Sequence, residues 1–253
     1  MRYGISTLSI IPVRNIPTDK AEMVNQILFG EHFKIIESKK EWSKILLAHD
    51  NYEGWICNNQ LVEIQKKEYN RIDKEISTIT TDILDIITKD HHQPIIIGSV
   101  LPLNKDGHIL INNELYKFDG NKTQGFTTKE KLIENAYIYL NTPYLWGGRT
   151  PFGIDCSGFV QIVYRLQGKR LPRDTNQQVE KGKKVDIVES EIGDLAFFDN
   201  EDGVIIHVGI IIDNNKIIHA SGKVRIDKLD KKGIYNSFKK IYSHNLHSIK
   251  RIF

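Results

Sequence analysis

The stretch Gly153-Ile154-Asp155-Cys156-Ser157-Gly158-Phe159 decides how the second half of this chain is interpreted. It follows a polar, glycine-rich turn at residues 146–149 and opens an apolar helix pattern that ends at Gly168. The first turn of a helix carries unpaired N–H groups and a partial positive charge, and both favour a thiolate over a thiol. Cys156 is therefore a candidate nucleophile, and Asp155 is a candidate N-cap.

Two histidines are candidate partners for this cysteine. His207 opens an apolar strand pattern, and His219 ends the next one, after a turn signal at Asn214-Asn215. Two antiparallel strands joined by a short turn place these histidines near each other. The resulting hypothesis is that Cys156 attacks, His207 takes its proton, and His219 orients and polarises His207.

Each of the three residues also has a simpler interpretation. A single cysteine is more often a buried structural residue, and a single histidine is more often an ordinary core or surface residue. A zinc site built from Cys156, His207 and His219 is a further alternative, but no Cys-x-x-Cys or His-Glu-x-x-His spacing supports it. We predict no metal and no cofactor.

Composition excludes several classes of protein. The 253 residues carry a net charge of +3, with Lys and Arg interleaved with Asp and Glu, so we expect no nucleic-acid partner. Two cysteines cannot form a disulfide framework, and no apolar run reaches the ~18 residues of a membrane span. Residues 1–8 lack the apolar core of a secretory signal, so we expect a cytoplasmic protein without membrane association.

The first half of the chain is rich in short β patterns. Segments at 33–37, 43–47 and 54–57 are separated by turn-forming residues and predict a small all-β barrel over residues 1–65. The charged stretch Lys66–Lys74 is interpreted as a connector. Strand patterns at 83–87, 94–101 and 108–111, the last two joined by a predicted turn at Asp106-Gly107, indicate a second barrel within 66–124. We expect two modules of this size to gain stability by packing on each other and on the third domain.

The remaining residues, 125–253, have a different pattern. Helical spacing begins at Thr127, with Thr128 as the expected cap, and continues to Asn141. Strand patterns return at 195–198, 207–212 and 216–220. Helices followed by an antiparallel sheet predict an α+β domain.

These motifs together resemble one known family. Residues 143–148, 153–160, 171–178, 193–198, 207–210 and 218–222 are similar, in order, to the conserved segments of the NlpC/p60 cell-wall cysteine peptidases. Gly54-Trp55-Ile56 resembles a strand of bacterial SH3-like domains. The resemblance implies a papain-like α+β catalytic domain preceded by two SH3-like barrels, in the layout of γ-D-glutamyl-L-diamino-acid endopeptidases of murein recycling.

The resemblance also implies roles for further residues. Asp155 would bind the free α-amino group of L-Ala in a murein peptide. Tyr52 and Glu22 of the first barrel would reach the same amine, with Glu31 as the rival to Glu22, and Cys156 would then face a cleft beside that barrel. Tyr144 and Trp146 would line the cleft, and the Tyr144 hydroxyl or the Cys156 N–H would stabilise the oxyanion. Around the D-Glu carboxylate and the scissile bond would lie Ser157, Arg173, Asp174 and Thr175, and Ser221 would form a further part of the cleft wall.

Three functions remain open at this point. The first is hydrolysis of the γ-D-glutamyl–diamino-acid bond of murein peptides through a thioester. The second is a wall-binding protein with an inactive peptidase-like domain, and the third is a related amidase or transferase on the same scaffold. We expect a monomer whose partners are murein peptides.

Overall fold

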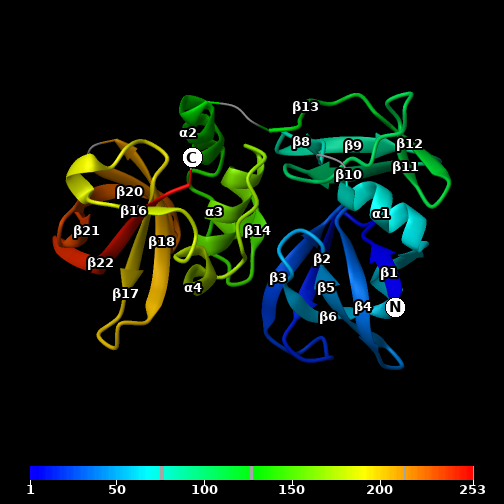
Figure 1. Ribbon diagram of the computed structural model, residues 1–253, viewed down its shortest axis with the longest axis horizontal. Helices are drawn as coiled ribbons and strands as arrows, with labels where there is room; N and C mark the ends of the chain where they lie inside the picture. Colours follow the sequence, from blue (N-terminus) through cyan, green and yellow to red (C-terminus); the bar gives the residue numbers. More distant parts are fainter. Residues whose placement is uncertain (75–76, 126–127, 214, 253) are drawn as a thin grey trace. The chain divides into compact units, whose positions relative to one another are not determined.

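The computed structural model describes residues 1–74, 77–125, 128–213 and 215–252 (Figure 1). The chain folds into two compact units. One contains Met1–Phe126 with Gly168–Arg170, and the other contains Thr127–Gln167 with Leu171–Phe253. No helix among the described residues is long and apolar enough to cross a membrane.

The first unit begins with a seven-stranded antiparallel sheet in the order β3-β2-β6-β5-β4-β1-β7. Its strands are β1 (Arg2–Ile5), β2 (Ile10–Arg14), β3 (Met23–Leu28), β4 (His32–Ser38), β5 (Trp42–Leu47), β6 (Glu53–Cys57) and β7 (Val62–Ile64), with a 3-10 turn η1 (Asn58–Gln60) before the last. Alternate residues of these strands, such as Ile11, Val13 and Ile45, point inward and form a buried apolar core. The curled sheet agrees with the small β module predicted for residues 1–65.

The stretch Lys66–Lys74, interpreted as a connector, is an α-helix, α1, between the two β modules. Its charged residues face outward, while Tyr69 and Ile72, three positions apart, are buried on one side. Two apolar residues in nine gave too weak a pattern to identify the helix. The same two side chains anchor it to the core.

The second β module consists of a four-stranded antiparallel sheet and a separate pair of strands. The sheet has the order β10-β9-β12-β11, and β13 pairs with β8. The bounds are β8 (Ile79–Thr80), β9 (Leu84–Thr88), β10 (His92–Ile96), β11 (Ile109–Ile111), β12 (Glu114–Phe118) and β13 (Lys122–Thr123). A second SH3-like barrel is not confirmed by this arrangement.

The turn predicted at Asp106-Gly107 does not join β10 to β11. Instead β10 pairs with β9, and β11 pairs with β12 across Asn112 and Asn113. Both asparagines have positive φ, 51° and 65°, which is the backbone of a two-residue hairpin turn. Asp106-Gly107 closes a looser loop, in which Leu103 and Ile109 form an isolated bridge.

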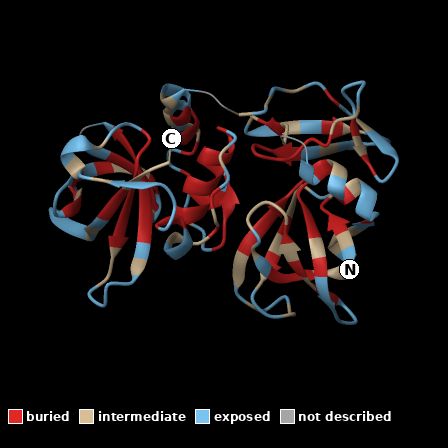
Figure 2. Ribbon diagram, in the orientation of Figure 1, coloured by how far each residue is buried: buried red, intermediate tan, exposed pale blue. Residues whose placement is uncertain are grey.

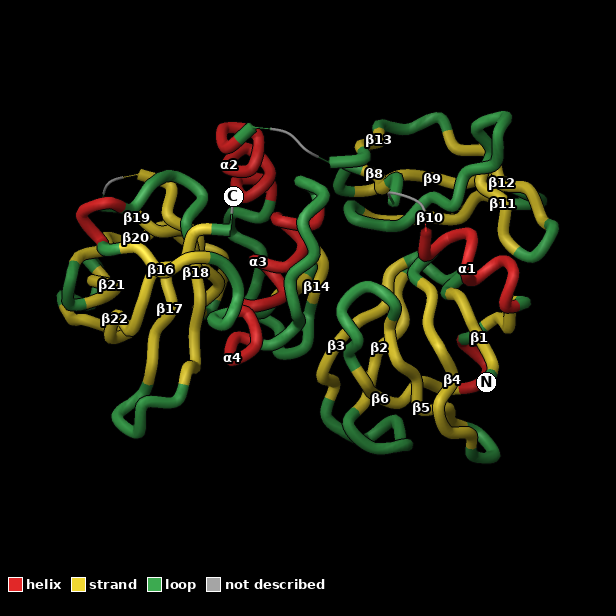
Figure 3. The backbone as a smooth tube through the Cα atoms, viewed as in Figure 1, coloured by secondary structure: helices red, strands yellow, loops and turns green. Residues whose placement is uncertain are grey.

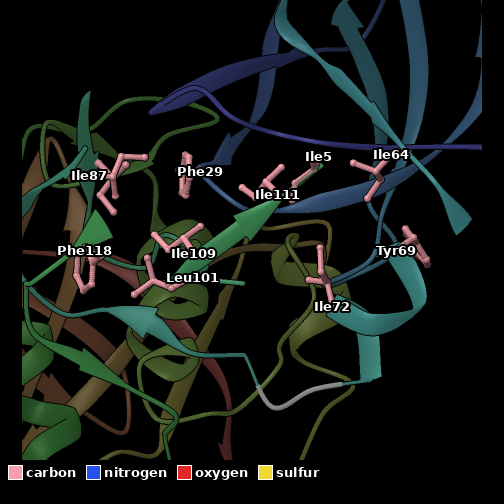
Figure 4. Packing of buried hydrophobic residues seen from close by; sticks show 11 residues of the cluster. Ile5, Phe29, Ile64, Tyr69, Ile72, Ile87, Leu101, Ile109, Ile111 and Phe118 are labelled. Carbon is pink, nitrogen blue, oxygen red and sulfur yellow. The ribbon is translucent and has the colours of Figure 1, made fainter. Parts of the chain in front are cut away.

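One hydrophobic core joins both β modules and α1. It contains Ile5 from the first sheet, Phe29 from the turn after β3, Tyr69 and Ile72 from the helix, and residues of the second sheet such as Ile109 (Figure 4). A β module of about 60 residues is marginally stable alone. Their expected packing on each other is therefore confirmed.

The second unit contains helices followed by a long antiparallel sheet (Figure 3). Its elements are α2 (Lys129–Ile138), β14 (Arg149–Thr150), β15 (Gly153–Ile154), α3 (Cys156–Arg165), α4 (Thr175–Gln178), β16 (Lys183–Val185), η2 (Ile187–Glu189), β17 (Leu195–Asp199), β18 (Ile205–Asp213), β19 (Lys216–Ser221), β20 (Lys223–Asp230), β21 (Gly233–Asn236) and β22 (Ile241–Arg251). The predicted α+β arrangement is therefore present, and Thr128 caps α2 by accepting a bond from the Lys131 N–H at 3.3 Å. Thr127 and Asn214, where a helix start and a turn were predicted, lie outside the described residues.

The sheet of the second unit closes on itself. Its order is β16-β22-β17-β18-β19-β20-β21, and β21 also pairs with β22, so β17 to β22 form a closed six-stranded barrel. Ala196, Phe198, Ile211, Ile217 and Leu229 are among the residues that fill its interior. The sequence patterns missed β20 and β22: β20 pairs directly with β19, which carries His219, and closure pairs β22 with β17, the neighbour of the strand that carries His207.

Helix α3 is the central element of this unit. All of its residues from Cys156 to Arg165 are buried (Figure 2). It packs against β18 and β19 on one side and against α2 on another. An apolar face alone was predicted, but a helix surrounded by protein positions its first residue more rigidly.

Candidate active site

The N-terminus of α3 is held by a carboxylate and a glycine loop. Asp155 caps the helix by accepting bonds from the N–H groups of Gly158, at 2.7 Å, and Gly147, at 2.9 Å. A Cβ atom on Gly158 would lie 2.4 Å from the carbonyl oxygen of Gly148. The loop and the helix therefore approach more closely than any other residue at position 158 would permit, and Cys156 is fixed at their junction.

Cys156 is 7% exposed, and its surroundings favour the neutral thiol. Burial raises the pKa of the thiol to about 12, and the charge of Asp155 adds to the rise. The N–H groups of Val208 and Ser157 and the charge of Arg173 act in the opposite direction. The helix start alone therefore does not produce a thiolate, and the thiol needs a base.

His207 and His219 lie beside each other on neighbouring strands. Nε2 of His207 is 2.8 Å from Nδ1 of His219, and both rings are buried. Gly209 lies directly opposite His219, and a Cβ atom there would lie 2.8 Å from the Cβ of His219. The Val208 N–H that borders the Cys156 sulfur belongs to the residue after His207, so the helix start and this strand meet at the candidate nucleophile.

Both histidines are held neutral. Burial lowers the pKa of His207 well below its usual value, and His219 and His244 lower it further. Burial also lowers the pKa of His219, although the neighbouring Asp227 raises it. A neutral imidazole can accept a proton, so His207 is in the form that a general base requires.

Three residues of this cluster escaped the sequence analysis. Nε2 of His219 is 3.1 Å from Oδ2 of Asp227, and Arg225 forms an ion pair with the same carboxylate. The ring of His244 stacks on that of His207, with centroids 4.2 Å apart and planes inclined by 23°. Burial lowers the pKa of His244 to about 4. The signal available in the sequence was the alternation of residues 223–230, in which Arg225, Asp227 and Leu229 share a face.

Asp155 and Arg173 form a buried bidentate ion pair. Nη1 of Arg173 donates to Oδ1 at 2.9 Å and Nη2 to Oδ2 at 2.5 Å, and Nη1 also donates to Oγ of Ser157 at 2.8 Å. The Asp155 carboxylate therefore has partners on both oxygens before any substrate binds. Its visible role is to join the helix start, the glycine loop and Arg173, and its role in binding an amine stays a prediction.

Three predicted cleft residues lie in the second unit: Tyr144 forms an isolated bridge with Ile154, Trp146 lies in a turn before α3, and Ser221 is the last residue of β19. Tyr144 is half-buried; burial raises its pKa to about 12, with contributions from Cys156 and Asp155. Its N–H donates to the carbonyl of Gly222, the residue after Ser221, at 3.0 Å. Trp146 is 59% exposed, so it presents an aromatic surface to solvent.

Asp174 and Thr175 begin the short helix α4. Asp174 is the residue before the helix, and Oγ1 of Thr175 donates to the carbonyl of Ile205 at 3.4 Å. This contact ties the 173–175 loop to the start of the strand that carries His207. The predicted roles of these residues in binding a carboxylate stay predictions.

Comparison with known proteins identifies the family. The sequence model of the NlpC/P60 family matches residues 141–243, and that of the bacterial dipeptidyl-peptidase SH3 domain matches residues 13–61. The chain is 30% identical over 212 residues to a γ-D-glutamyl-L-lysine dipeptidyl-peptidase of Bacillus subtilis. This alignment covers 77% of this chain and 71% of that protein. The chain belongs to the NlpC/P60 family.

Other relatives match most or all of the chain. Dipeptidyl-peptidase 6 of Lysinibacillus sphaericus is 26% identical over 245 residues, covering 85% of this chain and 87% of that protein. The crystal structure of an NlpC/P60 family protein from Bacillus cereus superposes with a TM-score of 0.82 at 20% identity, over 99% of both chains. The fold of this NlpC/P60 chain is therefore shared along its whole length.

The first unit of this NlpC/P60 chain carries the remaining predicted site residues, Glu22 and Tyr52, within the SH3 match. Glu22 is exposed, and its carboxylate accepts a bond from the Asn15 amide at 3.0 Å. Glu31 is buried, and its carboxylate accepts a bond from the Leu28 N–H at 2.7 Å in the turn after β3. Of the two rivals, only Glu22 lies on the surface. Tyr52 is half-buried against the core of the sheet.

No group of three or more His, Cys, Asp and Glu side chains within the described ranges could hold a metal ion. The zinc alternative therefore gains no support from the arrangement of Cys156, His207 and His219. That the reaction needs no metal stays a prediction.

Proposed function

We propose that this chain is a cysteine peptidase that hydrolyses the bond between γ-D-Glu and the diamino acid of murein peptides with a free N-terminal L-Ala. The observation that carries the proposal is the hydrogen bond between His207 and His219 beside the start of α3, where Cys156 lies. Membership in the NlpC/P60 family and the names of the dipeptidyl-peptidase relatives support it.

The proposed reaction begins with a neutral thiol and a neutral imidazole. The Cys156 sulfur attacks the γ-carbonyl carbon of D-Glu while its proton passes to Nδ1 of His207, because Nε2 of that ring already faces His219. Either the Tyr144 hydroxyl or the Cys156 N–H stabilises the oxyanion. The raised pKa of Tyr144 keeps its hydroxyl protonated and able to donate.

Collapse of the tetrahedral intermediate breaks the amide bond. The imidazolium of His207 gives its proton to the leaving amine, and the diamino acid departs. A thioester then joins L-Ala-γ-D-Glu to Cys156. Water, deprotonated by the now neutral His207, hydrolyses the thioester and restores the thiol.

Recognition of the free amine is the second part of the proposal. Glu22 and Tyr52 of the SH3 domain, together with Asp155, would select a peptide with a positively charged N-terminus. The exposed carboxylate of Glu22 supports its assignment over the buried Glu31. Because Arg173 already offsets the charge of Asp155, we expect Glu22 to contribute most of the electrostatic selection.

A cleavage assay with matched peptides tests both parts. The substrates are L-Ala-γ-D-Glu linked to meso-diaminopimelate or to L-Lys, each with a free and an acetylated N-terminus. We expect wild type to release the diamino acid from the free peptides, E22Q to lose activity mainly through KM, and C156A to be inactive. Release that survives in C156A would overturn the mechanism, and equal rates on acetylated peptides would overturn the amine recognition.

The binding-protein alternative predicts a different result in the same assay. An inactive peptidase-like domain would bind murein without releasing a diamino acid. A related amidase would instead cleave the acetylated peptides at least as well as the free ones. These outcomes separate the three functions.

A further inference from the structure

His219 lies between a histidine and a carboxylate on one face of the second sheet. Its Nδ1 is 2.8 Å from Nε2 of His207, and its Nε2 is 3.1 Å from Oδ2 of Asp227. The three residues come from adjacent strands β18, β19 and β20. They share the face that carries Ile211, Ile217 and Leu229, which places them at one end of the barrel interior.

The Asp227 carboxylate is fixed in a charged state. Its side chain is only 5% exposed, but Nη2 of Arg225 donates to Oδ1 at 2.9 Å and Nε of the same guanidinium is 2.7 Å from Oδ2. Burial raises the pKa of Asp227, yet the bonds from His219 and Arg225 and their charges outweigh burial and lower it. An ionised carboxylate can only accept hydrogen bonds.

This acceptor determines where the protons lie on both rings. Because Asp227 accepts, Nε2 of His219 must carry a proton, and Nδ1 of a neutral His219 must be an acceptor. Nε2 of His207 must then donate to it. The remaining nitrogen, Nδ1 of His207, is consequently unprotonated and able to receive the proton of Cys156.

We propose that Asp227, held by Arg225, is a positioning residue that sets the tautomers of His219 and His207, so that Nδ1 of His207 is the base for Cys156. The inference rests on the proposed role of Cys156 and His207 in catalysis. When the S–H bond breaks, the new N–H bond forms at Nδ1 of His207 and the electron pair stays on sulfur. The positive charge is then stabilised through His219 by the Asp227 carboxylate.

Other charged or titratable groups surround His207, His219 and Asp227 but are not part of this hydrogen-bonded set. His244, from β22, faces His207 in a stacked arrangement, and its Nδ1 is 2.9 Å from the Ser243 hydroxyl. On the helix side, Asp155 and Arg173 pair with each other. Tyr144 stays protonated at neutral pH because burial raises its pKa to about 12. Asp227 is therefore the ionised group in contact with His219 that can set its tautomer.

The first test reads the tautomers directly in wild type. In ¹⁵N-labelled protein at neutral pH, long-range proton–nitrogen NMR spectra distinguish a protonated ring nitrogen from an unprotonated one. We expect Nε2–H and unprotonated Nδ1 on both His219 and His207. The Nδ1–H form of either ring would overturn the inference, and this reading requires neither a variant nor a substrate.

The second test uses D227N, which preserves shape and removes the charge. Because Arg225 donates to the amide oxygen, the amide N–H group faces Nε2 of His219 and reverses both tautomers. We expect alkylation of Cys156 by iodoacetamide and peptide cleavage to fall by about 10²- to 10⁴-fold, as for loss of a tautomer-setting carboxylate elsewhere. D230N, at an exposed position of the same strand, is the matched control and should retain wild-type rates.

A double variant separates positioning from a structural effect. In an H219Q background, D227N should slow alkylation no further, because its effect passes through His219. The inference would be overturned if the effects of D227N and H219Q on the alkylation rate were fully additive. It would also be overturned if D227N alkylated at the wild-type rate with an unchanged pH dependence of alkylation. If wild type alkylates normally but cleaves no murein peptide, the proposed function fails while the tautomer result stands on its own.

Discussion

At the scale of single residues, the site is held by ion pairs that neutralise buried charge. Arg173 and Asp155 are 2% and 4% exposed and bind each other through two hydrogen bonds. A carboxylate buried at a helix start without this partner would cost several kcal/mol. The pair therefore determines the position of the residue that precedes Cys156.

Loss of the Arg173 side chain tests this role. We expect R173L to lower the free energy of unfolding by about 3–5 kcal/mol, because Asp155 would keep a buried charge without its guanidinium partner. R173K, which keeps the charge but not the planar fork, should lose less. Urea titrations measure both values. An R173L protein as stable as wild type would show that the pair contributes nothing to stability.

The site residues differ in how well the sequence could predict them. Cys156, His207 and His219 stand in segments with clear helix or strand patterns, so the expected meeting of the two histidines follows from a hairpin. Asp227 lies on the strand after β19 and could have been found from the alternation of residues 223–230, whereas His244 reaches the site on β22, which pairs with β17 by closing the barrel. Barrel closure depends on contacts between distant segments, which local patterns do not encode.

At the scale of elements, turns decide which strands pair. The hairpin of β11 and β12 depends on Asn112 and Asn113, both in the left-handed region. The sequence pattern indicated a turn at Asp106-Gly107 instead, because Asp-Gly is the stronger turn signal in general. Asn-Asn tolerates the same backbone, since the short polar side chain can bond locally. Helix α1 was missed for a related reason, because only two of its residues are buried.

Substitutions at Asn113 test the importance of this turn. Its φ of 65° suits glycine and disfavours β-branched residues. We expect N113G to leave the free energy of unfolding unchanged or slightly higher, and N113V to lower it by about 1–2 kcal/mol. Thermal or urea unfolding of the two variants measures the difference. Equal stability of N113V and N113G would contradict the assigned turn.

At the scale of the whole molecule, the two units bury different kinds of groups. In the first unit, the two β modules share one apolar core. The second unit buries neutral histidines inside a barrel. Composition and short patterns were sufficient to predict the β-rich first half and the α+β second half. The closed barrel and the shared core required tertiary contacts.

The histidine cluster gives the second unit a pH-dependent stability. The pKa of His244 is lowered to about 4, so unfolded protein binds a proton below pH 6.5 that the folded protein does not bind until about pH 4. This contribution to stability is therefore complete above pH 6.5 and falls as the pH drops toward 4, by at most ~1.4 kcal/mol per pH unit for each histidine and by less for the partly exposed His244.

The H244F variant removes one of these titrating groups and keeps a stacked ring. Hydrogen exchange of the β18 and β19 amides, read at pH 7 and pH 5 and corrected for intrinsic rates, reports the stability of this unit. We expect wild type to lose more protection between the two pH values than H244F does. Identical losses would show that His244 does not titrate between the folded and unfolded states as described.

In the proposed reaction, Cys156 forms a thioester with the acyl part of a murein peptide. Acid quenching during turnover of L-Ala-γ-D-Glu-diaminopimelate, followed by mass spectrometry of the protein digest, tests it most directly. We expect an L-Ala-γ-D-Glu adduct on the peptide that contains Cys156, present in wild type and absent in C156A. Release of diaminopimelate without any such adduct, continuing in C156A, would contradict it.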